Sequence, residues 1–198
     1  MPADWFEPVT LDGKHVRLEP LTPAHTGELR QTGSDPEIWR WMPARPPATA
    51  EAMAAIVDTA LTEQARGERM PFAIRDRTSG VAVGSSSYLD VVSAHRRLEI
   101  GWTWLGRDWW RTPANTEAKL LLLSHAFDTL GATRVALKTD AANVRSQAAI
   151  ERIGGVREGT LRAHLIRPDG TRRDTVYFSI LADEWPAARE RLTARLQR

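Results

Sequence analysis

The order of hydrophobic patterns along the chain limits its fold more than any other sequence feature. Apolar residues recur at helical spacing in the first third, alternate with polar residues through the middle, and then switch between the two periods after residue 113. Consecutive strands joined by short turns form an antiparallel meander, and later helices and strands add to the same sheet. We therefore expect an α+β fold on a mixed, mostly antiparallel sheet, with residues 1–198 as one domain.

Capping residues, glycines and prolines place the boundaries of these elements. Thr22-Pro23 and Thr49 are helix-start signals, and Gly131 and Gly154-Gly155 are helix stops. The expected helices are 23–33, 49–66, 113–130, 144–153 and one capped by Asp183, and the expected strands are 14–21, 71–76, 81–92, 96–105, 133–139, 160–166 and 172–181.

Composition excludes several classes of protein. A length of 198 residues with 42% hydrophobic content suits one compact domain. The absence of cysteine excludes disulfides, cysteine-bound zinc and a cysteine nucleophile. No segment approaches the roughly 18 apolar residues of a membrane span, so we expect a cytoplasmic protein without membrane contact. A net charge of +2 is too small to indicate nucleic-acid binding.

Residues 98–130 contain the first candidate site, a strand that leads through a short loop into a long helix. Thr112 and Pro113 are a capping residue and a first-turn proline in their preferred order. The first-turn N–H groups of a helix lack intrahelical partners and lie at the positive end of its dipole, so they can hold a phosphate. Because every helix has such an end, a purely structural interpretation stays open.

A second strand-to-helix connection lies at residues 134–153. Asn143 is placed to cap the helix and Ser146 follows three residues later, so both side chains can point into one crevice. The alternative is that the asparagine is only a cap and the serine an ordinary first-turn residue.

Taken in order, five segments resemble the GNAT superfamily, and within it the group around the ribosomal-protein N-terminal acetyltransferases RimJ and RimL. The resemblance runs from about Gly13 to Trp185. Its segments are GKHVRLEPL, LEIGW, WWRTPANTEAKLLLLSHAF, NVRSQAAIERIGGVREGTLR and RPDGTRRDTVYFSIL. It implies an α/β/α fold whose sheet splays between the fourth and fifth strands, and transfer of acetyl from acetyl-CoA to a primary amine, with a protein N-terminus as the expected acceptor.

The same resemblance implies which residues hold acetyl-CoA. The acetyl carbonyl would meet the backbone near residues 103–105, the pyrophosphate the loop and helix start, and the pantetheine and thiol the second helix start. No metal is expected. The implied cofactor-binding residues are Thr103, Trp104, Leu105, Arg111, Thr112, Pro113, Ala114, Asn115, Thr116, Asn143 and Ser146.

The chain departs from the family pattern in two respects. Arg111 and Pro113 stand where glycines are usual, and Leu165 falls where RimL-like enzymes have been assigned a glutamate. The first departure replaces flexible glycines of the loop by less flexible residues. The second removes one candidate base.

The catalytic candidates are Glu99 as general base and Ser146 as the group that contacts the thiol and donates a proton. Strand alternation puts Glu99 on the face of Gly101 and Thr103, although a solvated carboxylate would fit the same pattern. His164 and Asp174 are second choices.

Five of the eight tryptophans lie in segments near the loop or the acceptor side, which suits either core packing or an apolar acceptor groove. These are Trp39, Trp41, Trp102, Trp104 and Trp109. The sequence leaves open a small-molecule amine as acceptor, a CoA-binding domain with weak catalysis, and a homodimer.

Overall fold

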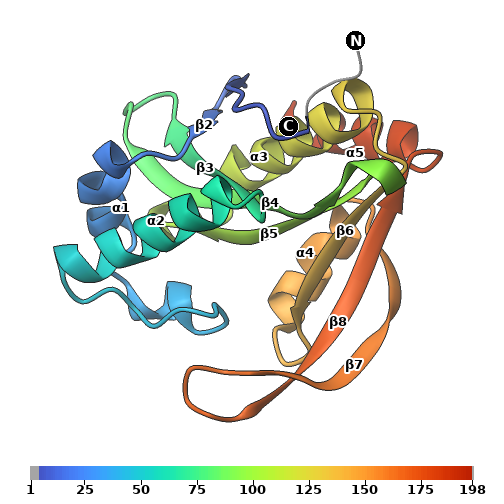
Figure 1. Cartoon of the computed structure of the whole chain (residues 1–198). Helices are drawn as coiled ribbons and strands as arrows, with labels where there is room; N and C mark the ends of the chain where they lie inside the picture. Colours follow the sequence, from blue (N-terminus) through green and yellow to red (C-terminus); the bar gives the residue numbers. More distant parts are fainter. Residues whose placement is uncertain (1–4, 198) are drawn as a thin grey trace.

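A computed structural model describes residues 5–197, whose strands form one eight-stranded sheet in the order β1-β2-β3-β4-β5-β6-β8-β7 (Figure 1). Every neighbouring pair is antiparallel except β5 and β6, which are parallel. The expected α+β class with a mixed, mostly antiparallel sheet is therefore confirmed. The strands are β1 Leu11–Asp12, β2 Val16–Pro20, β3 Arg69–Asp76, β4 Ala82–Val92, β5 Arg97–Leu105, β6 Arg134–Asp140, β7 Val156–Ile166 and β8 Arg172–Leu181.

Helices cover both faces of the sheet. Along β3, Phe72 and Ile74 point to one face and Ala73 to the other, as strand alternation requires. The first face packs against α3, α4 and α5, and the second against α1 and α2. The α-helices are α1 Thr26–Thr32, α2 Ala50–Ala65, α3 Pro113–Ser124, α4 Val144–Arg152 and α5 Trp185–Leu196, and the short helical segments are Pro23–His25, Pro36–Trp39, Ser93–His95, Arg107–Trp109 and the π-helical turn His125–Thr129.

Most helix starts follow the capping signals of the sequence. Thr49 accepts a hydrogen bond from the N–H of Ala52 at 3.2 Å, and Asn143 accepts one from the N–H of Ser146 at 3.1 Å. The last helix is different. Its capping position is Glu184, without a side-chain cap, so the expected cap at Asp183 is wrong.

A β-bulge interrupts β5 at the centre of the sheet. Ser87 pairs with Gly101 and Ser85 with Trp104. Between these two pairs, β5 therefore contains one more residue than β4. Trp102 takes a left-handed backbone conformation, with φ of 50°. A bulge exchanges the faces to which later side chains point, and this changes the site described below.

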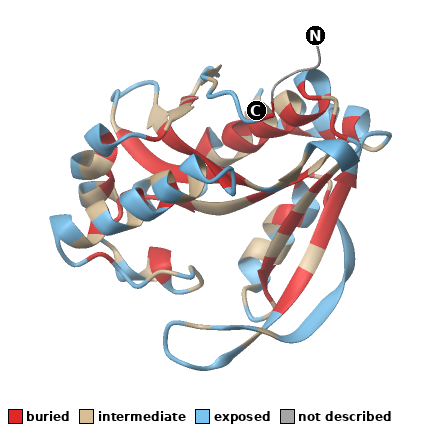
Figure 2. Ribbon diagram, viewed as in Figure 1, coloured by how far each residue is buried: buried red, intermediate tan, exposed pale blue. Residues whose placement is uncertain are grey.

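The long free edge of the sheet is β7, which begins at Val156 rather than at residue 160 as expected. Figure 2 shows β7 exposed along its length, whereas much of the neighbouring β8 is buried. Within residues 5–197, no helix is both long and apolar enough to cross a membrane.

Candidate functional site

The sheet opens between β5 and β6, the fourth and fifth of the expected strands. They pair over only three positions, Arg97 with Arg134, Leu98 with Val135, and Glu99 with Ala136. Both strands continue, to Leu105 and Asp140, without pairing to each other. The facing backbone edges beyond Glu99 and Ala136 therefore lack a partner strand, which leaves N–H and C=O groups for a ligand.

The loop before α3 keeps a glycine-like conformation without glycine. Arg111 has φ of 62°, a left-handed value that glycine adopts freely and arginine does not. Thr112 caps α3, because its Oγ1 accepts from the N–H of Ala114 at 3.3 Å and donates to the carbonyl of Trp109 at 2.8 Å. The exposed Pro113 occupies the first helical position. The loop thus accommodates both Arg111 and Pro113 in place of glycines.

The start of α4 is tied to that loop by an aromatic contact. The Arg145 guanidinium carbon lies 4.0 Å from the centroid of the Trp110 ring. Trp110 in turn donates from Nε1 to the carbonyl of Leu105 at 2.9 Å. Asn143 serves as the cap of α4, while the side-chain hydroxyl of Ser146 has no hydrogen bond among residues 5–197. Two helix starts and the end of β5 therefore lie together.

Glu99 lies at the point where β5 and β6 separate. It is 3% exposed, and its Oε2 is 3.1 Å from Nζ of Lys138 on β6. Its Oε1 is buried without a hydrogen-bond partner. Burial raises the pKa of the Glu99 carboxyl, although the Lys138 ammonium opposes the rise. A buried carboxylate with one free oxygen and a raised pKa is suited to accept a proton.

Buried side-chain atoms without hydrogen-bond partners, here called the polar cluster, are concentrated on β5 and on the two strands beyond β6. Within residues 5–197 there are five such side-chain atoms, and four belong to β5, β7 and β8. Buried polar groups in folded proteins are rarely left unpaired, so this concentration indicates a place where solvent or ligand completes the hydrogen bonding. The four are Glu99 Oε1, His164 Nδ1, Arg173 Nε and Thr175 Oγ1.

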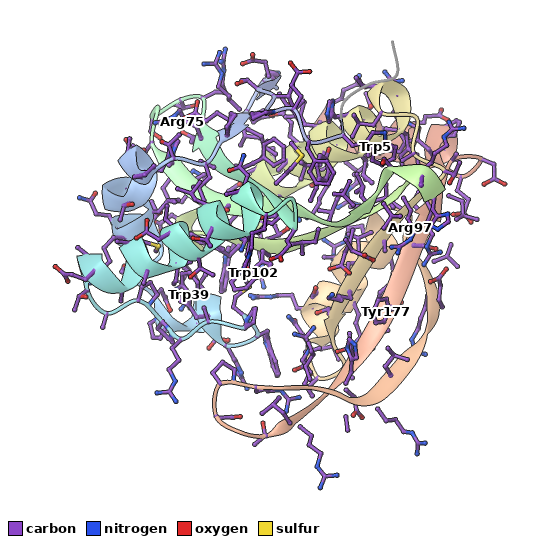
Figure 3. The ribbon with its side chains drawn as sticks, viewed as in Figure 1. Trp5, Trp39, Arg75, Arg97, Trp102 and Tyr177 are labelled. Carbon is purple, nitrogen blue, oxygen red and sulfur yellow. The ribbon has the colours of Figure 1, made fainter. Side chains whose placement is uncertain are left out.

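Aromatic side chains lie on both sides of the β5–β6 opening. In Figure 3, Trp39 and Trp102 lie on the α1–α2 side and Tyr177 on β8 across the divergent strands. The guanidinium carbon of Arg69 lies over the Trp102 ring, 4.6 Å from its centroid. Trp39 packs against Trp104 in the buried core, with ring centroids 5.1 Å apart. Both rings therefore belong to the buried core, and Trp39 also borders a surface pocket.

Thr103 does not share a face with Glu99, and that part of the sequence interpretation is wrong. Its Oγ1 accepts from Nζ of Lys119 on α3 at 2.6 Å and lies 2.7 Å from Oγ of Ser86. The bulge at Trp102 turns this side chain toward α3. With Trp104 and Leu105 also buried, these three residues offer the opening only their backbone.

The second-choice bases differ in their surroundings. Asp174 is exposed, and its Oδ1 accepts from the N–H of Ala163, which has a left-handed φ of 49°. Its role is to support the β7 bulge. His164 packs its ring edge-on against Tyr177 at 5.8 Å, inside the polar cluster. Leu165 is 39% exposed on β7 and brings no acid to the site.

A sequence model of the acetyltransferase (GNAT) domain matches residues 15–156. The chain belongs to the GNAT acetyltransferases. The matched residues include the β5–β6 divergence and the starts of α3 and α4. The expected resemblance to the RimJ and RimL group is confirmed as well.

Relatives of this GNAT chain cover different shares of it. A Bacillus subtilis protein named "Putative ribosomal N-acetyltransferase YdaF" is 34% identical over 106 residues, which is 54% of this chain and 57% of that protein. A GCN5-related N-acetyltransferase from Brucella melitensis is 34% identical with a TM-score of 0.91, covering 96% of this chain and 86% of that one. Mycobacterium smegmatis RimJ, solved in complex with CoA-disulfide, has the same fold at 24% identity, with a TM-score of 0.82 and 96% coverage of both chains.

GNAT enzymes use acetyl-CoA, and the residues present here fit it. The unpaired edge of β5 suits the amides of pantetheine. The start of α3, with Arg111 before it, suits a pyrophosphate because N–H groups and a cation gather there. The acetyl-transferring activity expected from the sequence is thus the family's activity.

Four residues adjoin the candidate site or its bordering residues but were not singled out by the sequence interpretation: Lys119, Lys138, Arg173 and Tyr177. Lys138 and Tyr177 were detectable in principle, because polar residues alternate with apolar ones along β6 and β8. Lys119 gives no such signal, since a lysine on an amphipathic helix is normally solvated.

Proposed function

We propose that this chain transfers the acetyl group of acetyl-CoA to the α-amine at the N-terminus of a protein or peptide, with residues 1–198 acting as one domain. The observation that carries the proposal is the Glu99 carboxylate, buried beside the divergence of β5 and β6 with one oxygen free. Acetyl-CoA supplies a thioester that an amine can attack directly.

Glu99 would take the proton of the incoming ammonium, directly or through water. The ordinary pKa of an α-amine is about 8, against about 10.4 for a lysine side chain. A carboxylate is a weak base, so it deprotonates the α-amine more readily than the lysine. This difference favours an N-terminal amine as acceptor, since the raised pKa of Glu99 brings base and acceptor closer.

The two remaining tasks are to stabilise the oxyanion and to protonate the departing thiolate. Backbone N–H groups of residues 103–105 are proposed to stabilise the oxyanion, because β6 does not pair with them. The Ser146 hydroxyl has no hydrogen-bond partner among the described residues 5–197 and is proposed to contact the thiol. Since a thiol has a pKa of about 8.5, its thiolate is already a fair leaving group and a hydroxyl donor is sufficient.

One name among the relatives supports a protein acceptor, since YdaF carries the name "Putative ribosomal N-acetyltransferase". The RimJ structure contains CoA-disulfide, which supports CoA as the carrier of the acetyl group. The polar cluster around Glu99 offers a peptide backbone the unpaired groups it needs, since Arg173 Nε can donate and Glu99 Oε1 can accept.

Release of free CoA, measured with a thiol reagent, tests the proposal. The substrates are a peptide with a free N-terminus, the same peptide blocked at its α-amine but containing lysine, and a polyamine. We expect release with the first only, and binding of acetyl-CoA by calorimetry. Release with the polyamine alone would make the chain a small-molecule enzyme, and binding without release would make it a CoA-binding domain.

A further inference from the structure

A surface pocket of about 180 Å³ lies between two segments that are far apart in sequence. One segment is the loop from the Pro36–Trp39 turn toward α2, and the other is the turn between β7 and β8 at residues 167–169. Arg45 spans them, because its Nη2 donates to the carbonyl of Pro168 at 3.2 Å. In Figure 1 the β7–β8 turn extends below the loop that leads into α2.

The lining of this pocket combines arginines with apolar side chains. Trp39 and Met42 form part of its wall. Arg167 is committed to Asp140 through two hydrogen bonds of 2.7 and 3.0 Å. Arg40 lies 3.5 Å from Glu37. Arg45 differs from both, since it forms no ion pair with a carboxylate within residues 5–197.

The lining also contains one carboxylate, Asp169, against three arginines, so arginine is in excess there. Asp169 forms no ion pair with Arg45 within residues 5–197, and its Oδ1 accepts from the N–H of Thr171 at 2.9 Å and from the hydroxyl of Thr171 at 2.6 Å. Arginine also outnumbers acid along the whole hairpin. Residues 157–174 contain Arg157, Arg162, Arg167, Arg172 and Arg173 against Glu158, Asp169 and Asp174.

A chain of charged contacts joins the pocket to the catalytic cluster. Arg167 binds Asp140, and Asp140 lies 3.9 Å from Nε of Arg173. The charge of Arg173 acts on Glu99 in turn. An extended acceptor with its amine at Glu99 would have to lie along this series of charged residues to reach the pocket.

We propose that this pocket is a subsite for an acidic side chain close to the N-terminus of the acceptor, with Arg45 as its counter-charge. The proposal rests on the proposed function, because it needs a peptide acceptor. The pocket volume admits one side chain, its apolar wall covers the methylene groups of aspartate or glutamate, and the guanidinium supplies donors that match a carboxylate.

Acetylation of a peptide series tests the subsite. The peptides share a free N-terminal serine and differ only by aspartate, asparagine or lysine at the second, third or fourth position. At one position we expect kcat/KM for aspartate to exceed that for asparagine by about fivefold, the value of one partly exposed ion pair, with lysine lowest. The preference should weaken as salt is added, because the pair is solvent-accessible.

Charge reversal identifies the residue responsible. Arg45→Glu should make the lysine peptide the better substrate, and Arg45→Gln should make the aspartate and asparagine peptides equal. Arg195→Glu on α5 makes the same charge change outside the pocket and should keep the aspartate preference.

Two results would overturn the subsite while leaving the proposed function standing. One is equal kcat/KM for all peptides with the unaltered chain. The other is an aspartate preference that survives in Arg45→Glu. If no peptide is acetylated but a small amine is, the N-terminal acceptor itself is wrong and the subsite falls with it.

Discussion

Replacing Lys119 by methionine should stabilise the protein, and more at neutral than at alkaline pH. The side chain is 7% exposed between α3 and the sheet, and it has no carboxylate partner within residues 5–197. Within the described part of the chain, its ammonium donates to the hydroxyl of Thr103 alone. Burial therefore lowers the pKa of Lys119 from 10.5 to about 7.

The size of the effect follows from that pKa. One pKa unit corresponds to about 1.4 kcal/mol. Burial of the Lys119 side chain therefore lowers the free energy of unfolding by about 4 kcal/mol at pH 7. The unfolded chain binds the proton more tightly than the folded chain, so stability rises with pH from about 7 to about 10. Between pH 7 and pH 9 the gain is about 2 kcal/mol. Methionine removes this dependence and forfeits one hydrogen bond, worth about 1 kcal/mol.

Urea unfolding of Lys119→Met at pH 7 and pH 9 measures both quantities. We expect the variant to be more stable by about 2–3 kcal/mol at pH 7 and to lie within about 1 kcal/mol of the unaltered chain at pH 9. Lys14→Met, at an exposed lysine, is the control and should change neither value. A variant that is less stable at pH 7, or whose advantage is equal at both pH values, would refute the reasoning.

Three further substitutions test the candidate site and the stability of the fold around it. Glu99→Gln should lower turnover at neutral pH by about 10²- to 10⁴-fold and recover part of it as pH rises, because more of the amine is then already deprotonated; unchanged turnover across the pH range would move the role to His164 or to water. Ser146→Ala should lower the transfer rate more than it weakens CoA binding in calorimetry, and equal rates would leave a purely structural residue. Glu117→Gln should lower the free energy of unfolding by about 3 kcal/mol, because this buried carboxylate accepts three backbone N–H groups at 2.8, 2.6 and 2.7 Å; a loss below about 1 kcal/mol in urea titration would contradict that account.

Local signals were sufficient for much of the fold. Thr112 with Pro113, and Asn143 at the start of α4, fix helix starts because a cap is decided by neighbouring residues. The order of strands and helices also determined the mixed sheet. Both kinds of signal act over a few residues, which is the range that periodicity and capping describe.

The bulge at Trp102 lay beyond such signals. Gly101 suits a bulge or a close ligand approach, but a glycine alone does not fix where an extra position enters β5, since the register is set by pairing with β4. Strict alternation therefore put Thr103 beside Glu99, whereas the structure turns it toward Lys119. The pocket that we propose for an acidic side chain could not be found from the sequence for a related reason. Arg45 and Pro168 are 123 residues apart and meet only in the folded chain.

Only three residue pairs join β5 to β6 in the described structure, so this seam divides the sheet into two parts, here called leaves. One leaf is β1 to β5 and the other is β6, β8 and β7. Because so few hydrogen bonds cross the seam, fluctuations that part the leaves cost less than fluctuations within either one. Amide protons at the seam should therefore exchange with solvent before those inside β3, β4 or β8. Acetyl-CoA bound along the unpaired edges of both β5 and β6 would hold the two parts of the sheet together. Its binding should therefore slow amide exchange even on strands that it does not contact.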